Sequence, residues 1–179
     1  MQALRLIILT GLSIFAGLCF SQDNETANLG YKLGQGDKII IKIFGQDDLT
    51  LETQLNDSGT INYPFLGSLI VQGLTVEQTE ALIYNGLKGD YIVEPNVFVG
   101  VVEYRPFYIH GQVNRAGGYA YQPGMTLSQA IALAGGLTER GSKEKIFITR
   151  ESKVTAIQAG SFDTPIRAGD TIIINQRFF

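Results

Sequence analysis

The residue types that usually carry catalysis are few in this sequence and far apart. His110 is the single histidine and falls in a predicted strand, so a Ser–His–Asp relay or a histidine-based metal cluster would depend on one ring. Two carboxylate pairs, Asp47 with Asp48 and Asp163 with Asp170, could supply acid and base to a glycoside. Their turn-like surroundings favour a structural role, because aspartate in turns bonds its own backbone. We therefore predict that the protein is not an enzyme and holds no cofactor and no metal.

Cys19 is the single cysteine and ends an N-terminal segment that has the pattern of an export signal. The apolar run 6–18 is too short to span a bilayer stably, and residues 1–21 are predicted to form the signal peptide. Two fates remain open for Cys19: lipidation, or removal with the signal. Leu18 directly before it and Ala16 three residues before it depart from the lipoprotein pattern, which favours removal. A mature chain without cysteine has neither a disulfide nor a thiolate metal site.

Aromatic side chains are the better candidates for binding. Tyrosine rings can stack on the apolar C–H faces of sugars, although packing within strands is their commoner role. Tyr119 and Tyr121 are predicted to share one face of one strand, which makes them the first pair to test. The candidate contacts to a polymer or to a second subunit are Tyr63, Phe65, Arg105, Tyr108, Tyr119 and Tyr121.

The elements that position these residues are clearest in the stretch 107–136. Residues 107–113 alternate apolar with polar in the period of a half-buried strand, and 115–118 supply the reversal into a return strand that begins at Tyr119. Thr126 and Gln129 have the spacing of a capping box, so a helix is expected to begin there and to end at the glycine pair 135–136.

A second capping box is formed by Thr75 and Gln78, and the helix that it opens is expected to end at Gly86 or Gly89. The nearly continuous apolar run 38–44 predicts a strand buried on both faces. Other strands are predicted at 49–55, 60–63, 68–72, 91–93, 97–102, 145–150, 154–157 and 169–174.

Composition limits the class of protein. Of 179 residues, 45% are hydrophobic, enough for a core, and 21 glycines favour short strands joined by tight turns. A net charge of -3 with scattered lysine and arginine gives no footprint for nucleic acid. We predict an α+β fold of two small mixed β-sheet/helix modules, 31–104 and 105–179, after a flexible arm at 22–30. Gly36–Ile41 and Gly169–Ile174 are nearly the same hexapeptide, which suggests a repeat without establishing one.

Several segments, taken in order, resemble the outer-membrane polysaccharide export proteins of bacteria, and the resemblance covers essentially all of the chain after the signal. One departure is Ala116, where the family commonly has proline before the glycine of the hairpin. The segments are Tyr31-Lys32-Leu33-Gly34 with Gly36-Asp37, Gly59-Thr60-Ile61 with Tyr63-Pro64-Phe65-Leu66-Gly67, Gly73-Leu74-Thr75, Pro95-Asn96-Val97, Tyr108 to Gly118, Met125-Thr126-Leu127, and Ala130 to Gly136.

The resemblance implies a polysaccharide export domain followed by a soluble-ligand-binding β-grasp domain, assembled into rings through which polymer passes. It further implies a role in capsule or exopolysaccharide export in the periplasm, in association with the outer membrane. The implied partners are polysaccharide, further copies of the chain, an outer-membrane β-barrel protein and an inner-membrane polysaccharide co-polymerase. Because longer relatives continue past the last strand, we expect a short form without their C-terminal membrane helix.

Two other functions stay open at this point. The first is a monomeric periplasmic module that binds a carbohydrate or another ligand with its β-grasp domain. The second is a periplasmic hydrolase of the polymer, which the scarcity of catalytic residue types disfavours. Self-association separates the first from a conduit, and shortening of the polymer by purified protein would reveal the second.

Overall fold

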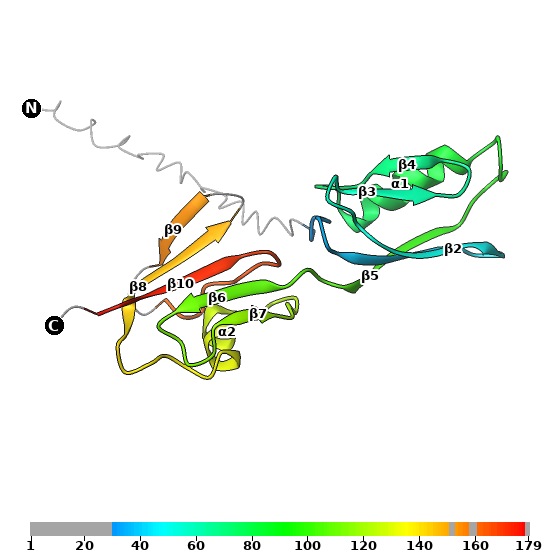
Figure 1. The fold of residues 1–179 in the computed structure, drawn as a ribbon. Helices are drawn as coiled ribbons and strands as arrows, with labels where there is room; N and C mark the ends of the chain where they lie inside the picture. The colour runs from blue at the N-terminus through cyan, green and yellow to red at the C-terminus, as the bar shows by residue number, and fades with distance from the viewer. Residues whose placement is uncertain (1–29, 151–152, 158–160, 178–179) are drawn as a thin grey trace, which may run out of the picture.

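The computed structural model describes residues 30–150, 153–157 and 161–177 (Figure 1). The predicted signal peptide, Cys19 and nearly all of the predicted arm lie outside these residues. The elements are β1 (Lys38–Ile43), β2 (Gln46–Gln54), β3 (Thr60–Tyr63), β4 (Gly67–Ile70), α1 (Val76–Leu87), β5 (Val97–Glu103), β6 (Phe107–Gly111), β7 (Gly117–Tyr119), α2 (Leu127–Leu133), β8 (Gly141–Arg150), β9 (Lys153–Ile157) and β10 (Thr171–Gln176).

These elements form two lobes, each with its own cluster of buried hydrophobic side chains. The first lobe comprises residues 30–103 and the second lobe residues 107–177, and the linker 104–106 carries the chain from β5 directly into β6 (Figure 1). An antiparallel sheet in the first lobe and a mixed sheet in the second, with one helix in each lobe, confirm the predicted α+β fold class.

The first lobe is built on an antiparallel sheet of order β2-β1-β5. Helix α1 and the β3–β4 hairpin lie on one side of this sheet (Figure 1). In β1 the side chains of Ile39, Ile41 and Ile43 are buried, whereas Lys42 is exposed and Ile40 only partly covered. The prediction that this strand is buried on both faces was therefore wrong, because helix and hairpin cover a single face.

The second lobe contains a five-stranded sheet of order β7-β6-β10-β8-β9. β10 runs parallel to β6 and antiparallel to β8, so the sheet is mixed. The inward side chains of β6, β8 and β10 join those of α2 in one core, which includes Phe107, Ile109, Leu127, Ile146 and Ile172. Since the two sheets differ in order and direction, the near-identical hexapeptides do not mark a repeated topology.

Both predicted capping boxes are present. At α1 the Thr75 hydroxyl accepts from the Gln78 N–H, and the Gln78 side chain accepts from the Thr75 N–H at 2.9 Å. At α2 the Gln129 side chain accepts from the Thr126 N–H, also at 2.9 Å. α1 ends at Leu87, between the two glycines predicted as its end.

Most predicted strands are present with ends shifted by a few residues, and the larger differences are at residues 91–93, at β7 and at β8. Residues 91–93 contribute one isolated bridge, between Lys88 and Ile92, because a tight turn at Gly89 follows the helix directly. β7 ends at Tyr119, so Tyr121 lies outside the strand that was predicted to hold both rings. β8 begins at Gly141, earlier than predicted.

Among the described residues, no helix has the length and apolarity needed to cross a membrane.

Candidate functional site

A buried carboxylate joins the first lobe to the linker. The Asp37 side chain has no exposed surface, and its oxygens accept hydrogen bonds from the Gly34 N–H at 2.7 Å and from the Arg105 N–H at 2.8 Å. The Tyr31 hydroxyl donates to the same carboxylate at 2.7 Å, and the Arg105 guanidinium pairs with it at 2.9 Å. Since a buried charge needs partners of this kind, the group ties residues distant in sequence into one unit.

Three tyrosine rings continue this unit across the junction. Tyr104 lies edge-on to Tyr31 with ring centroids 4.7 Å apart, and Tyr121 of the second lobe lies 5.7 Å from Tyr104 at a steep angle. Burial is the larger of two causes that raise the pKa of Tyr31 well above its ordinary value, and the hydrogen bond to Asp37 is the second. Burial likewise raises the pKa of Tyr121. Both phenols are therefore neutral over the physiological range.

Arg105 also approaches the second lobe. A Cβ at Gly169 would lie 2.8 Å from the Arg105 Nε, and the Gly169 φ of +82° suits glycine. The structure thus brings two predicted site residues, Arg105 and Tyr121, to one junction between the lobes. Tyr31 and Asp37 were not predicted as site residues. Tyr31 and Asp37 lie in motifs noted for the resemblance, and Asp37 also lies in the repeated hexapeptide, which is the signal that pointed to them.

Two other predicted site residues pack against the cores of their own lobes, Tyr63 fully buried and Tyr119 partly buried. Tyr63 is 2% exposed, and its hydroxyl donates to the Leu49 carbonyl at 2.8 Å, so its ring belongs to the first core. Tyr119 stacks on Phe107 at 5.9 Å, and its hydroxyl donates to the Arg115 carbonyl at 2.7 Å. Tyr119 and Tyr121 both pack against the core of the second lobe, but they do not belong to one strand, because β7 ends at Tyr119.

The remaining two candidates are exposed. Tyr108, 51% exposed, lies on the sheet face opposite the buried Phe107 and Ile109, and it shares that face with His110. Phe65 is 62% exposed at the tip of the β3–β4 hairpin and stacks on Tyr91, with ring centroids 4.9 Å apart and planes 29° apart. These exposed rings are able to meet a ligand without rearrangement of the core.

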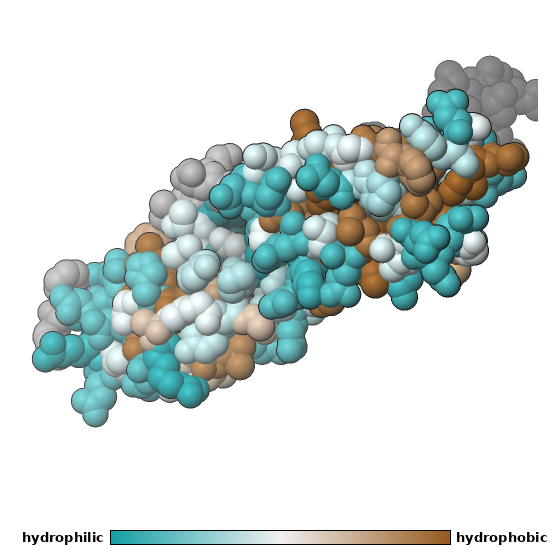
Figure 2. All heavy atoms as spheres, turned by 45° about the vertical axis from the view of Figure 1, so that its right-hand side comes forward, coloured by the Kyte–Doolittle hydropathy of each residue, from teal (hydrophilic) through white to brown (hydrophobic). Residues whose placement is uncertain are grey.

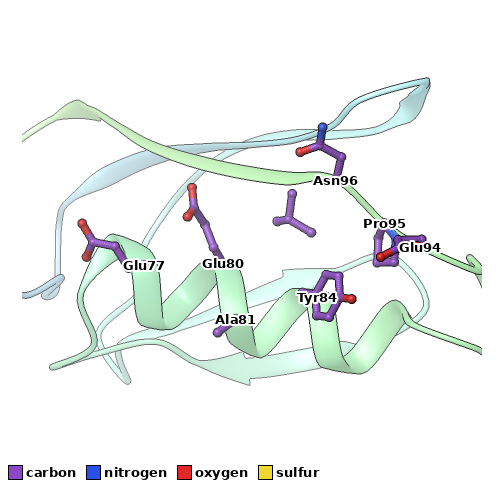
Figure 3. Close-up of a pocket in the computed structure, with 8 residues that line it drawn as sticks. Glu77, Glu80, Ala81, Tyr84, Glu94, Pro95 and Asn96 are labelled. Carbon is purple, nitrogen blue, oxygen red and sulfur yellow. The ribbon is translucent and has the colours of Figure 1, made fainter.

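Two open hollows accompany these residues. A hollow of about 550 Å³ lies between α1 and the start of β5 (Figure 3). Figure 3 shows Glu77 and Glu80 projecting from α1 toward that strand, with Tyr84 and Glu94 at the other end. Glu80 is engaged there, because its carboxylate accepts from the Val99 N–H at 2.9 Å. The acidic lining disfavours an anionic ligand.

The second hollow, about 560 Å³, lies beside α2 in the second lobe. Its polar side chains are Arg115, Gln122 and Gln129, and its apolar ones include Met125 and Leu133. The Arg115 guanidinium donates to the Leu133 carbonyl at 3.0 Å, at the C-terminal end of the helix. Within the part of the chain that the structure describes, no cluster of three or more histidine, cysteine, aspartate or glutamate side chains is arranged to hold a metal ion.

Comparison with known proteins agrees with this two-lobe arrangement. Residues 25–102 match the family described as polysaccharide biosynthesis/export protein, and residues 106–161 match the SLBB domain. The exopolysaccharide production protein ExoF of Rhizobium meliloti (strain 1021) is 28% identical over 166 residues, 81% of this chain and 38% of that protein. The polysialic acid transport protein KpsD of Escherichia coli is 28% identical over 162 residues, 84% of this chain and 29% of that protein. The chain thus spans less than two fifths of the length of these relatives.

Proposed function

We propose that the chain serves in the export of a capsule polysaccharide or exopolysaccharide, because residues 25–102 match the polysaccharide biosynthesis/export protein family and residues 106–161 match the SLBB domain. One observation carries the proposal: two family matches follow one another along the chain, and each falls on a lobe with its own core. The names of the two relatives, one in exopolysaccharide production and one in polysialic acid transport, support the same substrate class.

The finer proposal places the protein in the periplasm in association with the outer membrane, as an oligomeric conduit or adaptor. Its partners there would be polysaccharide, further copies of itself, an outer-membrane β-barrel protein and an inner-membrane polysaccharide co-polymerase. The second lobe would be a β-grasp domain, and the domain boundaries would fall near residues 104 and 105. Exposed strand edges such as that of β7 offer backbone groups for pairing between copies.

The proposed mechanism is passive. A conduit has to bind its cargo weakly enough to release it, so scattered aromatic and polar contacts suit transport better than one tight site. Exposed rings such as Phe65 and Tyr108 are contacts of this kind. The free energy for transport would come from the partners, and this chain would supply a path.

Deletion of the gene, followed by assay of surface polysaccharide, tests the export role. We expect loss of surface polymer in the deletion strain and its return when the wild-type gene is supplied. Normal surface polymer in a deletion strain without a paralogue would refute the role. Cell fractionation of the complemented strain tests the periplasmic location separately.

A monomeric ligand-binding module is the second candidate, and the hollow beside α2 is the observation in its favour. Its mixture of Arg115, two glutamine amides and apolar side chains is typical of a small-ligand site. Size-exclusion chromatography with light scattering at increasing concentration separates the candidates. A protein that remains monomeric at the highest concentration, with and without purified polymer, would favour the module over the conduit.

A further inference from the structure

The Phe65 backbone is unusual. It has a φ of +65°, and among the described residues every other positive φ belongs to glycine. A bulky side chain adopts this region only at a cost, since its Cβ crowds the neighbouring carbonyl. Burial does not offset that cost, because 62% of the Phe65 side chain is exposed. Residues held in such sparsely populated backbone regions cluster at functional sites, where the strain is retained for the task of the side chain.

Phe65 does not stand alone. Tyr91 comes from the loop after α1, is 51% exposed and stacks on the Phe65 ring with centroids 4.9 Å apart. Both loops lie at the end of the first lobe that points away from the second lobe (Figure 1). Figure 2 shows hydrophobic side chains gathered on the surface of the first lobe, at the upper right of the view. Exposed aromatic side chains gathered at one end of a lobe are candidates for an interaction site.

The surroundings of the pair limit its ligand. Asn62 and Ser68 form a cross-strand pair on the exposed face of the β3–β4 hairpin, next to the tip that carries Phe65. Their amide and hydroxyl groups suit the hydroxyls of a sugar. The carboxylates of Asp90 and Glu94 flank Tyr91 along the chain and oppose an anionic membrane surface.

We propose that the Phe65–Tyr91 pair is a saccharide-stacking contact that takes a sugar ring without acidic groups from the exported polymer, an inference that rests on the proposed export function. The outward face of one ring of the stack accepts the apolar C–H face of a pyranose, and the polar side chains of Asn62 and Ser68 on the same hairpin offer hydrogen bonds to sugar hydroxyls. Stacking of this kind tolerates many sugars and releases them readily, as a moving polymer requires.

The chain contains no tryptophan, which allows a direct binding measurement. Phe65→Trp keeps an aromatic ring at the tip and gives the protein a single indole reporter. The probe is polysaccharide purified from the surface of the producing strain, with dextran as a neutral reference polymer. We expect a saturable change in indole emission on addition of the purified polysaccharide. Phe98→Trp is the matched control, because Phe98 is 43% exposed on the sheet of the same lobe, and its emission should not change.

Affinity of unlabelled variants for the same polysaccharide, measured by calorimetry, gives the second test. Phe65→Gly and Tyr91→Ala should each weaken binding roughly 3- to 10-fold, as expected for the loss of one aromatic contact. Phe98→Ala should bind as wild type does. Glycine relieves the strain at position 65, so the Phe65→Gly protein is expected to fold, and lost binding cannot be assigned to unfolding.

Two results would overturn the inference: no response of the Phe65→Trp protein, or wild-type affinity in Phe65→Gly. Wild-type affinity accompanied by a smaller oligomer in Phe65→Gly would make the pair a contact between copies. In cells, the deletion strain separates this inference from the export role. If wild-type and Phe65→Gly/Tyr91→Ala genes restore surface polymer equally, the stacking contact fails and the export role stands. If deletion leaves surface polymer normal, the export role itself fails.

Discussion

Replacement of Asp37 by asparagine tests the junction most directly. The carboxylate accepts from two backbone N–H groups, the Tyr31 hydroxyl and the Arg105 guanidinium, whereas an amide keeps a single acceptor oxygen. The position taken by the NH₂ group of asparagine faces hydrogen-bond donors that it cannot accept from. At least two hydrogen bonds to this buried side chain are therefore lost. Hydrogen bonds to charged groups contribute about 1.5–3 kcal/mol each. Because Arg105 is 27% exposed and partly rehydrated, we expect the low end of that sum, about 3 kcal/mol.

Urea unfolding followed by circular dichroism measures this loss. Thermal unfolding gives a second measure of it. Each kcal/mol of lost stability lowers the melting temperature of a lobe of this size by about 4–8 °C, so the Asp37→Asn protein should melt roughly 12–24 °C below wild type. Asp57→Asn is the matched control: this aspartate lies exposed in the turn before β3 and should change stability by no more than about 0.5 kcal/mol. An Asp37→Asn protein within about 1 kcal/mol of wild type would show that the buried carboxylate is not what holds the junction.

Three further predictions concern stability. Because the pKa of Tyr31 is raised in the folded protein, the folded state keeps a proton that the unfolded state releases near pH 10. The free energy of unfolding should therefore fall as the pH rises above about 10. Tyr31→Phe should make this fall shallower in unfolding curves measured at alkaline pH. Gly111→Ala should lower the free energy of unfolding, measured by chemical denaturation, by more than about 2 kcal/mol, because a Cβ there would collide with the Ile174 carbonyl. Gly124→Ala, which has open space around it, should lower it by only about 1 kcal/mol. Phe65→Gly should lie within about 1 kcal/mol of wild type in the same assay, since relief of strain offsets lost stacking; a loss above 2 kcal/mol would mean that the ring is structural.

Local signals predicted the secondary structure where the physics is local. The capping boxes at Thr75 and Thr126 involve residues three apart, and both helices begin where these pairs place them. The error at 38–44 has a different origin. A run of isoleucines indicates a strand but not how many layers cover it, and only the tertiary arrangement left Phe44 63% exposed.

The candidate site was less accessible to sequence reasoning. Arg105 and Asp37 are 68 residues apart, and nothing in either segment names the other as its partner. Phe65 was proposed for its ring alone, because the sign of φ at a non-glycine residue has no signature in the sequence. Tyr91 was assigned to a strand, where stacking on the tip of a hairpin would not be expected.

The repeated hexapeptide has a physical explanation that does not require duplication. In both copies a glycine with positive φ precedes a fully buried aspartate, whose Oδ2 accepts from the N–H three residues earlier, at Gly34 for Asp37 and at Arg167 for Asp170. Each aspartate then pairs with an arginine from another element, Asp37 with Arg105 and Asp170 with Arg150 at 2.6 Å. The strands that follow lie inside sheets of different direction. Both β1 and β10 are central strands that begin beside a buried aspartate. A glycine–aspartate turn followed by isoleucines meets this requirement in the antiparallel sheet and in the mixed sheet alike.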